Sequence, residues 1–159
     1  MLDTENSFFV RFMVIDLKKL RFRGIRETDF RFDFPADDSL ITLPFSSFSK
    51  PIAVEGRLTV GNGEVYADGK ISYAISTRCS RCFEPVAYEK TIDFDEVFSE
   101  NGVLDDAYPY YKETVDLGDM VKDNVILSFP YSILCREDCK GVCPVCGVDL
   151  NKERCDCKK

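Results

Sequence analysis

The sequence predicts an α+β fold: a mostly antiparallel β meander or barrel-like sheet with one main helix and a cysteine-rich tail. Three observations predict it. Short segments of alternating apolar and polar residues, separated by turn signals, follow one another between residues 28 and 97. Apolar side chains recur at helical spacing near residues 116–128. Six of the eight cysteines fall within residues 135–159, so we expect a β-rich domain over residues 1–134 and a tail from residue 135.

The composition narrows the classes of function. The net charge of −7 opposes non-specific binding to nucleic acid or membrane, so any RNA contact needs a local basic patch or a protein partner. The chain has no histidine, which excludes histidine-ligated metals and Ser-His-Asp or Cys-His catalysis. Residues 1–5 do not resemble a secretory leader, and no apolar run suits a membrane span. We therefore expect a cytoplasmic protein with reduced thiols.

The first elements are a strand and a basic segment. Residues 7–17 are rich in β-branched and aromatic side chains, which predicts a strand. Residues 18–26 then carry five cations, and in an extended chain every second side chain would share one face. Such a face is either a solvated strand surface or a contact surface for RNA phosphates. The candidate RNA-binding residues are Lys18, Lys19, Arg21, Arg23 and Arg26, together with Arg78 and Arg81 of a later turn.

A half-buried strand is predicted for residues 28–34, where three phenylalanines alternate with charged residues. A turn at residues 35–39 and a loop at residues 46–49 follow. These assignments place one aromatic face of the strand against a core.

Residues 52–60, 64–77 and 86–97 then read as three strands of a meander. The sequence Gly61-Asn62-Gly63 predicts a hairpin between the first two, because Asn-Gly favours turns that match the strand twist. The turn between the second and third strands carries two thiols at its tip, those of Cys79 and Cys82.

Residues 99–114 read as an acidic linker with an aromatic patch, whose carboxylates suit a solvated loop better than a general acid–base pair. Asp116 offers an N-cap to a helix that runs to about Leu127, and Pro130 ends it. The apolar stripe of this helix is formed by Leu117, Met120, Val121 and Val125.

The tail holds the strongest chemical signal. In Cys143-Pro144-Val145-Cys146-Gly147, two thiols flank a tight turn. Pro144 fixes φ, and Gly147 tolerates the positive φ that turns backbone N–H groups toward sulfur. Such knuckles occur in pairs, because Zn²⁺ binds four thiolates in a tetrahedron at about 2.3 Å. The tail has few apolar side chains, so we expect it to be ordered only with bound metal.

Eight thiols in four close pairs predict two zinc ions per chain. One site would be a compact zinc ribbon-like unit in the tail, and the other would clamp the hairpin tip to the segment after the helix. An alternative is a single zinc whose ligands are taken from among the six C-terminal thiols, with Cys79 and Cys82 left reduced. The two-site model pairs Cys79 and Cys82 with Cys135 and Cys139, and Cys143 and Cys146 with Cys155 and Cys157.

Other cysteine chemistries remain open at this point. Four disulfides in a secreted protein would use the same thiols, although the close spacing suits a metal better. A redox-active Cys-x-x-Cys needs a helix N-terminus to lower the thiol pKa, whereas Cys79 and Cys82 lie between two strands. An iron–sulfur cluster also accepts four cysteines, but the compact knuckle suits zinc or a single iron better.

The motifs together resemble the YceD family of large ribosomal RNA subunit accumulation proteins, in the form with a cysteine-rich tail. The resemblance covers roughly residues 50–157 and is loose before them. Family members that lack the tail keep the hairpin Cys-x-x-Cys and a pair after the helix, which supports the pairing above. Three stretches carry the resemblance: residues 76–85 (S-T-R-C-S-R-C-F-E-P), residues 115–130 up to the proline stop, and residues 139–157 (C-K-G-V-C-P-V-C-G, then L-N and C-D-C).

The resemblance implies a bacterial or plastid protein needed for accumulation of large-subunit ribosomal RNA, through its synthesis, processing or stability. The expected function is a non-enzymatic ribosome biogenesis factor, stabilised by zinc, that binds precursor RNA or a basic large-subunit ribosomal protein. Two alternatives remain. A metal-dependent RNA-processing enzyme would need clustered carboxylates, which are scattered here. A purely structural zinc-binding interaction module, or a zinc store, is the other.

Overall fold

An open six-stranded sheet forms the body of the molecule, in a computed structural model that describes residues 13–157. Neighbouring strands run antiparallel except β6 and β7, which are parallel. No helix among residues 13–157 is long and apolar enough to cross a membrane. The order is β2 (Glu27–Phe34), β4 (Ile52–Val60), β5 (Glu64–Arg78), β6 (Pro85–Glu100) and β7 (Tyr108–Tyr110), with β3 (Ser47–Phe48) paired to β5.

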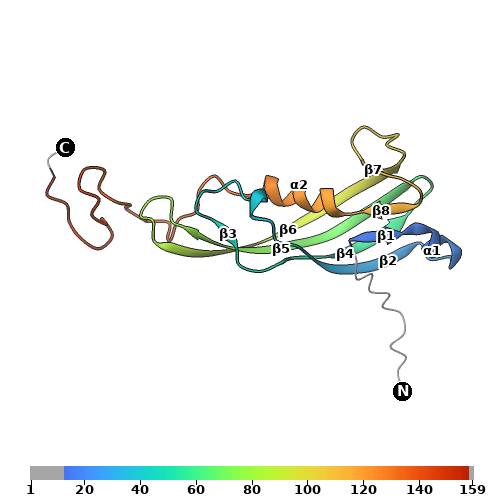
Figure 1. Cartoon of the computed structure of the whole chain (residues 1–159), viewed down its shortest axis with the longest axis horizontal. Coiled ribbons are helices and arrows are strands. Elements are labelled where there is room, and N and C mark those ends of the chain that lie inside the picture. The colour runs from blue at the N-terminus through green and yellow to red at the C-terminus, as the bar shows by residue number, and fades with distance from the viewer. Residues whose placement is uncertain (1–12, 158–159) are drawn as a thin grey trace, which may run out of the picture.

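The predicted meander is confirmed, and the sheet is open rather than closed into a barrel. The hairpin of β5 and β6 is its longest unit, paired without interruption from Glu64 opposite Ser99 to Arg78 opposite Pro85. This hairpin runs along the molecule, so its tip lies at one end, and the C-terminal segment extends beyond that tip (Figure 1). The cysteine-bearing turn therefore lies far from the Gly61-Asn62-Gly63 turn at the opposite end.

The main helix, α2 (Gly118–Ser128), lies over one face of the sheet (Figure 1). The N-cap of this helix is Leu117 rather than the predicted Asp116. The carboxylate of Asp116, one residue earlier, still accepts a hydrogen bond of 2.8 Å from the N–H of Gly118, which satisfies one of the free donors of the first turn. The hydroxyls of Tyr73 and Ser128 are 2.9 Å apart and join the end of α2 to β5. The predicted apolar stripe is buried as expected: Leu117, Met120, Val121 and Val125.

The extended conformation expected for residues 18–26 is wrong. Leu17–Phe22 form a short helix, α1. The Asp16 carboxylate accepts hydrogen bonds from the N–H groups of Lys18 and Lys19 at 3.0 and 3.3 Å, which caps the helix. Leu17 and Leu20 are buried at helical spacing. The alternating basic face is therefore replaced by cations distributed around one helical turn and the residues after it.

Three other expectations need correction. Of the strand expected at residues 7–17, residues 7–12 lie outside the described part, and only β1 (Val14–Asp16) is a strand. It pairs with β8 (Thr114–Asp116) in a separate two-stranded sheet. The loop expected at residues 46–49 contains β3, and the linker expected at residues 99–114 contains β7. A short 3₁₀ helix (Asp38–Leu40) follows the predicted turn after β2.

Candidate metal centres

The eight cysteines form two groups of four, in the pairing that the spacing predicted. Within each group the four sulfur atoms lie within 4.8 Å of one another, and all eight thiols are free rather than joined as disulfides. A tetrahedral zinc with Zn–S bonds of about 2.3 Å places its sulfurs about 3.8 Å apart. Cluster 1 is Cys79, Cys82, Cys135 and Cys139, and cluster 2 is Cys143, Cys146, Cys155 and Cys157.

The individual sulfur distances fit this geometry. In cluster 1, the sulfurs of Cys79 and Cys139 are 3.7 Å apart, and those of Cys82 and Cys135 are 3.5 Å apart. In cluster 2, the Cys155 sulfur lies 3.6 Å from that of Cys146 and 3.2 Å from that of Cys143. These separations are near the edges of a thiolate tetrahedron, and far longer than the S–S bond of about 2.0 Å in a disulfide.

The tail knuckle has the expected backbone. The N–H of Val145 points to the Cys143 sulfur at 3.4 Å, and the N–H of Gly147 donates to the Cys143 carbonyl at 2.9 Å. Gly147 has a φ of +75°, the left-handed conformation that glycine adopts freely. Hydrogen bonds from the N–H groups of Cys146 and Val145 lower the pKa of the Cys143 thiol to about 6. The turn thus favours the thiolate that a metal requires.

The hairpin tip repeats this backbone. The N–H of Arg81 points to the Cys79 sulfur at 3.5 Å, and the N–H of Phe83 donates to the Cys79 carbonyl at 3.0 Å. Phe83 takes the place of Gly147 and has a φ of +62°. Burial opposes ionisation of Cys79, but hydrogen bonds from the N–H groups of Cys82 and Arg81 lower its pKa to about 6.

Each cluster also contains a thiol that resists ionisation. Cys135 is exposed as a residue, but partial loss of water around its sulfur, together with the sulfurs of Cys82 and Cys139, raises its pKa to about 12. The sulfurs of Cys155 and Cys146 raise the pKa of Cys157 to about 12. Four thiolates this close repel one another unless a cation lies between them. The donor set therefore fits a divalent metal ion, which would allow all four sulfurs to ionise together.

The two clusters differ in burial. Cys79, Cys82 and Cys139 are buried against Val86, Leu134 and Val142, and Cys135 is exposed. In cluster 2 only Cys143 is buried, and Cys146 is exposed. Cluster 1 therefore forms a small core of its own at the hairpin tip.

Hydrogen bonds from the backbone and from the Arg81 side chain join the hairpin tip to the segment after α2. The N–H of Ser80 donates to the carbonyl of Ile133 at 2.8 Å, and the Arg81 guanidinium donates to the carbonyl of Cys139 at 2.9 Å. Gly141 crosses the tip so closely that an added Cβ would lie 3.1 Å from the Arg81 carbonyl oxygen. Its φ of +75° also favours glycine.

Asn151 is a residue whose role at the site sequence reasoning missed. Its side-chain oxygen accepts hydrogen bonds from the N–H of Lys140 at 2.8 Å and from the Arg136 guanidinium at 2.9 Å. Its amide points to the Cys139 sulfur at 3.4 Å. Asn151 thus connects the loop inside cluster 2 to a ligand of cluster 1. The signals in the sequence were its place between Cys146 and Cys155 and its part in the L-N of the motif that carries the family resemblance.

The basic candidates fall into two places. Arg78 and Arg81 lie at the cysteine-bearing tip, where the Arg78 guanidinium donates to the carbonyl of Phe83 at 3.1 Å. The remaining five lie in and just after α1, at the opposite end of the molecule (Figure 1). The structure therefore does not bring all seven together: Lys18, Lys19, Arg21, Arg23 and Arg26 form one group, and Arg78 and Arg81 another.

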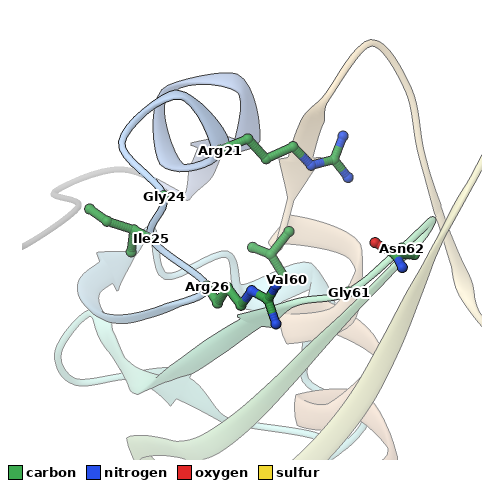
Figure 2. Close-up of a pocket in the computed structure, with 7 residues that line it drawn as sticks. All are labelled: Arg21, Gly24, Ile25, Arg26, Val60, Gly61 and Asn62. Carbon is green, nitrogen blue, oxygen red and sulfur yellow. The ribbon is translucent and has the colours of Figure 1, made fainter.

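At the α1 end, a cavity of about 440 Å³ is open to solvent between the helix and the turn that joins β4 to β5. Arg21, Arg26 and Asn62 contribute its polar side chains (Figure 2). The Arg21 guanidinium also forms an ion pair of 2.7 Å with Glu113, and Lys19 lies 3.8 Å from Asp16. Part of the basic charge of the segment is therefore neutralised within the fold.

A family model described as "Large ribosomal RNA subunit accumulation protein YceD" matches residues 67–159, more than half of the chain. The chain belongs to the YceD family. The matched part contains most of β5, all of β6 and α2, and both cysteine clusters, whereas α1 and the first strands of the sheet precede it. No solved structure matches the chain.

Relatives with bacterial and plant sources are similar to parts of the chain. An uncharacterized protein of Mycobacterium tuberculosis is 33% identical over 96 residues, which cover 56% of this chain and 46% of the relative. The Bacillus subtilis protein YlbN is 31% identical over 104 residues, covering 62% and 60%. A chloroplastic YCED homolog 1 of Arabidopsis thaliana, named a large ribosomal RNA subunit accumulation protein, is 36% identical over 50 residues, covering 31% and 16%. The chain spans about half the length of the first of these relatives.

Proposed function

We propose that this protein is a non-enzymatic ribosome biogenesis factor that supports accumulation or processing of large-subunit ribosomal RNA. The observation that carries the proposal is the family match, because it spans both cysteine clusters and the helix that positions the second half of cluster 1. The names printed for the plant relatives point to the same process. We place its action in the bacterial cytoplasm.

The metal in this proposal is zinc, with two ions per chain. All eight ligands would be thiolates, and four-coordinate all-thiolate zinc is typical of structural sites. Such an ion has no open coordination position for a substrate or water, so its contribution is to hold the fold. Within residues 13–157 the clusters of metal-ligating side chains are these two cysteine groups, so the proposal assigns no catalytic metal.

In terms of domains, we propose that residues 1–134 form the β-rich body and residues 135–159 the zinc-binding tail. Cluster 1 is then the joint between them, because two of its ligands come from each part. The hydrogen bonds of Ser80 and Arg81 support this joint. The tail would therefore have a fixed direction relative to the sheet when metal is bound.

The proposed partner is the large-subunit ribosomal RNA precursor, with basic side chains meeting its phosphates. The α1 group and the tip arginines offer two contact regions on a chain whose net charge is otherwise negative. A basic ribosomal protein is the alternative partner, and it would meet exposed carboxylates such as Asp105 and Asp106.

The test is depletion of the protein in its host, followed by complementation. We expect the ratio of large-subunit to small-subunit ribosomal RNA to fall on depletion and to recover with the native chain. The double variant Cys79→Ser/Cys139→Ser should fail to restore it, and the control Ser132→Ala should restore it. Co-purification with precursor particles or with a free ribosomal protein identifies the partner. An unchanged ratio after complete depletion would refute the proposed function.

A further inference from the structure

A second, smaller cavity of about 140 Å³ lies directly beside cluster 1. The turn before β3 contributes Leu43, Pro44 and Phe45, and the hairpin tip contributes Arg78 and Phe83. Cys79 lies in its wall, so the cavity is built on the backbone that the cluster holds. Both phenylalanines are largely exposed, Phe45 at 74% and Phe83 at 52%. We call this cavity and its two aromatic rings the aromatic groove.

Both rings are attached to backbone that disfavours them. Phe45 has a φ of +56° and Phe83 a φ of +62°, a region that L-residues other than asparagine rarely adopt. At the equivalent position of the tail knuckle, Gly147 adopts the same conformation without a steric penalty. Phe45 follows Pro44 in a turn, where glycine or asparagine is the usual left-handed residue. Two positions that suit glycine thus carry large aromatic side chains.

Among the described residues, the other left-handed positions that are not glycine have a tolerant side chain or a contact within the fold. The carbonyl of Lys112 accepts a hydrogen bond from the hydroxyl of Thr114 at 3.3 Å. Asn101 belongs to the residue types that accept this conformation. The carbonyl of Glu113 accepts the N–H of Leu17 at 2.8 Å, and its carboxylate pairs with Arg21.

At Phe83 the conformation follows from the knuckle, but the knuckle does not require a large side chain there, as Gly147 shows. Phe45 and Phe83 both line the cavity and are largely exposed. Backbone strain retained at such a place is typical of binding sites.

The chemistry of the groove favours one kind of occupant. Its volume is well below the roughly 300–1,000 Å³ of a site for a whole small-molecule ligand, so it suits one inserted group. Flat aromatic faces next to an arginine are the features with which proteins stack unpaired RNA bases. Arg78 also lines the cavity, and its guanidinium donates to the Phe83 carbonyl, so a cation that could pair with a phosphate is held at the groove.

We propose that the aromatic groove binds one unpaired base of the ribosomal RNA precursor, stacked on Phe83 and Phe45, with Arg78 beside its phosphate. This inference rests on the proposed function and adds the binding site to it. It also assigns cluster 1 a purpose, because the cluster fixes the backbone from which Phe83 projects.

The experiment measures binding of the zinc-loaded full chain to a single-stranded RNA oligonucleotide that carries 2-aminopurine, a base whose fluorescence is quenched by stacking. The matched duplex is the comparison. We expect quenching and binding with the single strand, and much weaker binding with the duplex. Loss of one stacked base corresponds to about a five- to hundredfold loss of affinity.

The key variant is Phe83→Gly, because it removes the ring and relieves the backbone. We expect an unchanged or higher unfolding temperature and an unchanged zinc content, together with loss of quenching and the affinity loss above. A purely structural role for the ring would instead lower the unfolding temperature. Phe83→Tyr should retain binding, because it keeps an aromatic ring. Phe83→Leu keeps an apolar side chain of similar bulk but has no flat ring for a base to stack on, so it should lose quenching. Phe45→Leu should weaken binding in the same direction.

Native affinity and quenching in both Phe83→Gly and Phe45→Leu would overturn the base-binding groove and leave the proposed function intact. Binding of a ribosomal protein that tolerates Phe83→Leu, with no binding of the oligonucleotide, would also overturn it and assign the groove to an apolar side chain. The proposed function itself is judged separately, by ribosomal RNA accumulation in depleted cells.

Discussion

The two cysteine clusters contain the same type of knuckle but connect different parts of the fold. Cluster 1 joins thiols that are 53 and 60 residues apart in the chain, from the hairpin tip and from the segment after α2. Cluster 2 closes a loop within the tail, where its paired thiols are 9 and 12 residues apart. Cluster 1 is mostly buried and supported by Ser80, Arg81 and Asn151. Cluster 2 is less buried, and the backbone hydrogen bonds around it lie within the tail itself.

Cluster 2 is therefore a local cross-link within the tail, whereas cluster 1 is a long-range cross-link between the tail and the sheet. Cluster 2 orders its own loop, which has almost no apolar core. Cluster 1 sets the position of the whole tail relative to the sheet and shapes the surface beside Phe83. The consequences of losing each metal site should therefore differ in extent, and the following measurements test that difference.

Removal of both metal ions should have the largest effect. Metal binding contributes on the order of 10 kcal/mol to the folding of small zinc-binding peptides. With a strong chelator, we expect amide hydrogen exchange to accelerate throughout residues 135–157 and to stay slow in the paired strands β5 and β6 away from their tip. Slow exchange in the tail after complete metal removal would show that the clusters do not order it.

Variants that remove one ligand should show which cluster contributes more to the stability of the sheet. We expect Cys139→Ser and Cys146→Ser each to lose one metal ion, but Cys139→Ser should lower the unfolding temperature of the body several degrees further. The reason is that it releases the joint with the hairpin tip, where Ser80 and Ile133 form their hydrogen bonds. Calorimetry with metal analysis measures both effects. If the two variants lower the unfolding temperature equally, the distinction between cluster 1 as a long-range cross-link and cluster 2 as a local one is wrong.

Glycine substitutions should give a smaller, graded effect. Gly141 and Gly147 share a φ of +75°, so alanine at either position is strained by about 1–3 kcal/mol. At Gly141 the new Cβ would also meet the Arg81 carbonyl at 3.1 Å, whereas nothing lies within 4 Å at Gly147. Gly141→Ala should therefore lower the free energy of unfolding more than Gly147→Ala. Denaturant titration of the two variants checks the order, and the reverse order would argue against close crossing at the tip.

Charge reversal at α1 should give the smallest effect, a loss of RNA affinity. It tests the end of the molecule that lies opposite the cysteine clusters. Arg21→Glu/Arg23→Glu should weaken RNA binding several-fold and flatten its dependence on salt, because fewer counterions are released. The control Arg57→Glu/Lys70→Glu reverses the charge of two cations on the sheet, which pair with Asp29 and Asp93. Fluorescence anisotropy over a range of salt concentrations measures both pairs of variants. If the two double variants lose the same RNA affinity and show the same dependence on salt, α1 is not a specific contact region.

Much of the sheet follows from local signals in the sequence. Alternating side chains gave the β4, β5 and β6 strands, and the Asn-Gly turn fixed the first hairpin. Close cysteine spacing gave the grouping of the thiols, because two knuckles and two further pairs leave few ways to build four-ligand sites. Whether these thiols bind zinc remains a prediction.

The features that were not predicted from the sequence have identifiable physical causes. The basic segment reads as extended until Asp16 is recognised as an N-cap and Leu17 and Leu20 as its buried face. The parallel pairing of β7 depends on contacts with β6 that no local pattern reveals. The left-handed conformation of Phe83 follows from its place after a Cys-x-x-Cys knuckle, but the residue type itself gives no such signal.

The most direct test of the account is the zinc content of the purified chain, measured by elemental analysis and by native mass spectrometry. The proposed joint, ordered tail and aromatic groove all depend on two ions that the two cysteine groups would hold. We predict close to two zinc ions per chain, falling to one in Cys146→Ser. One ion or none in the native chain would contradict the two-site account.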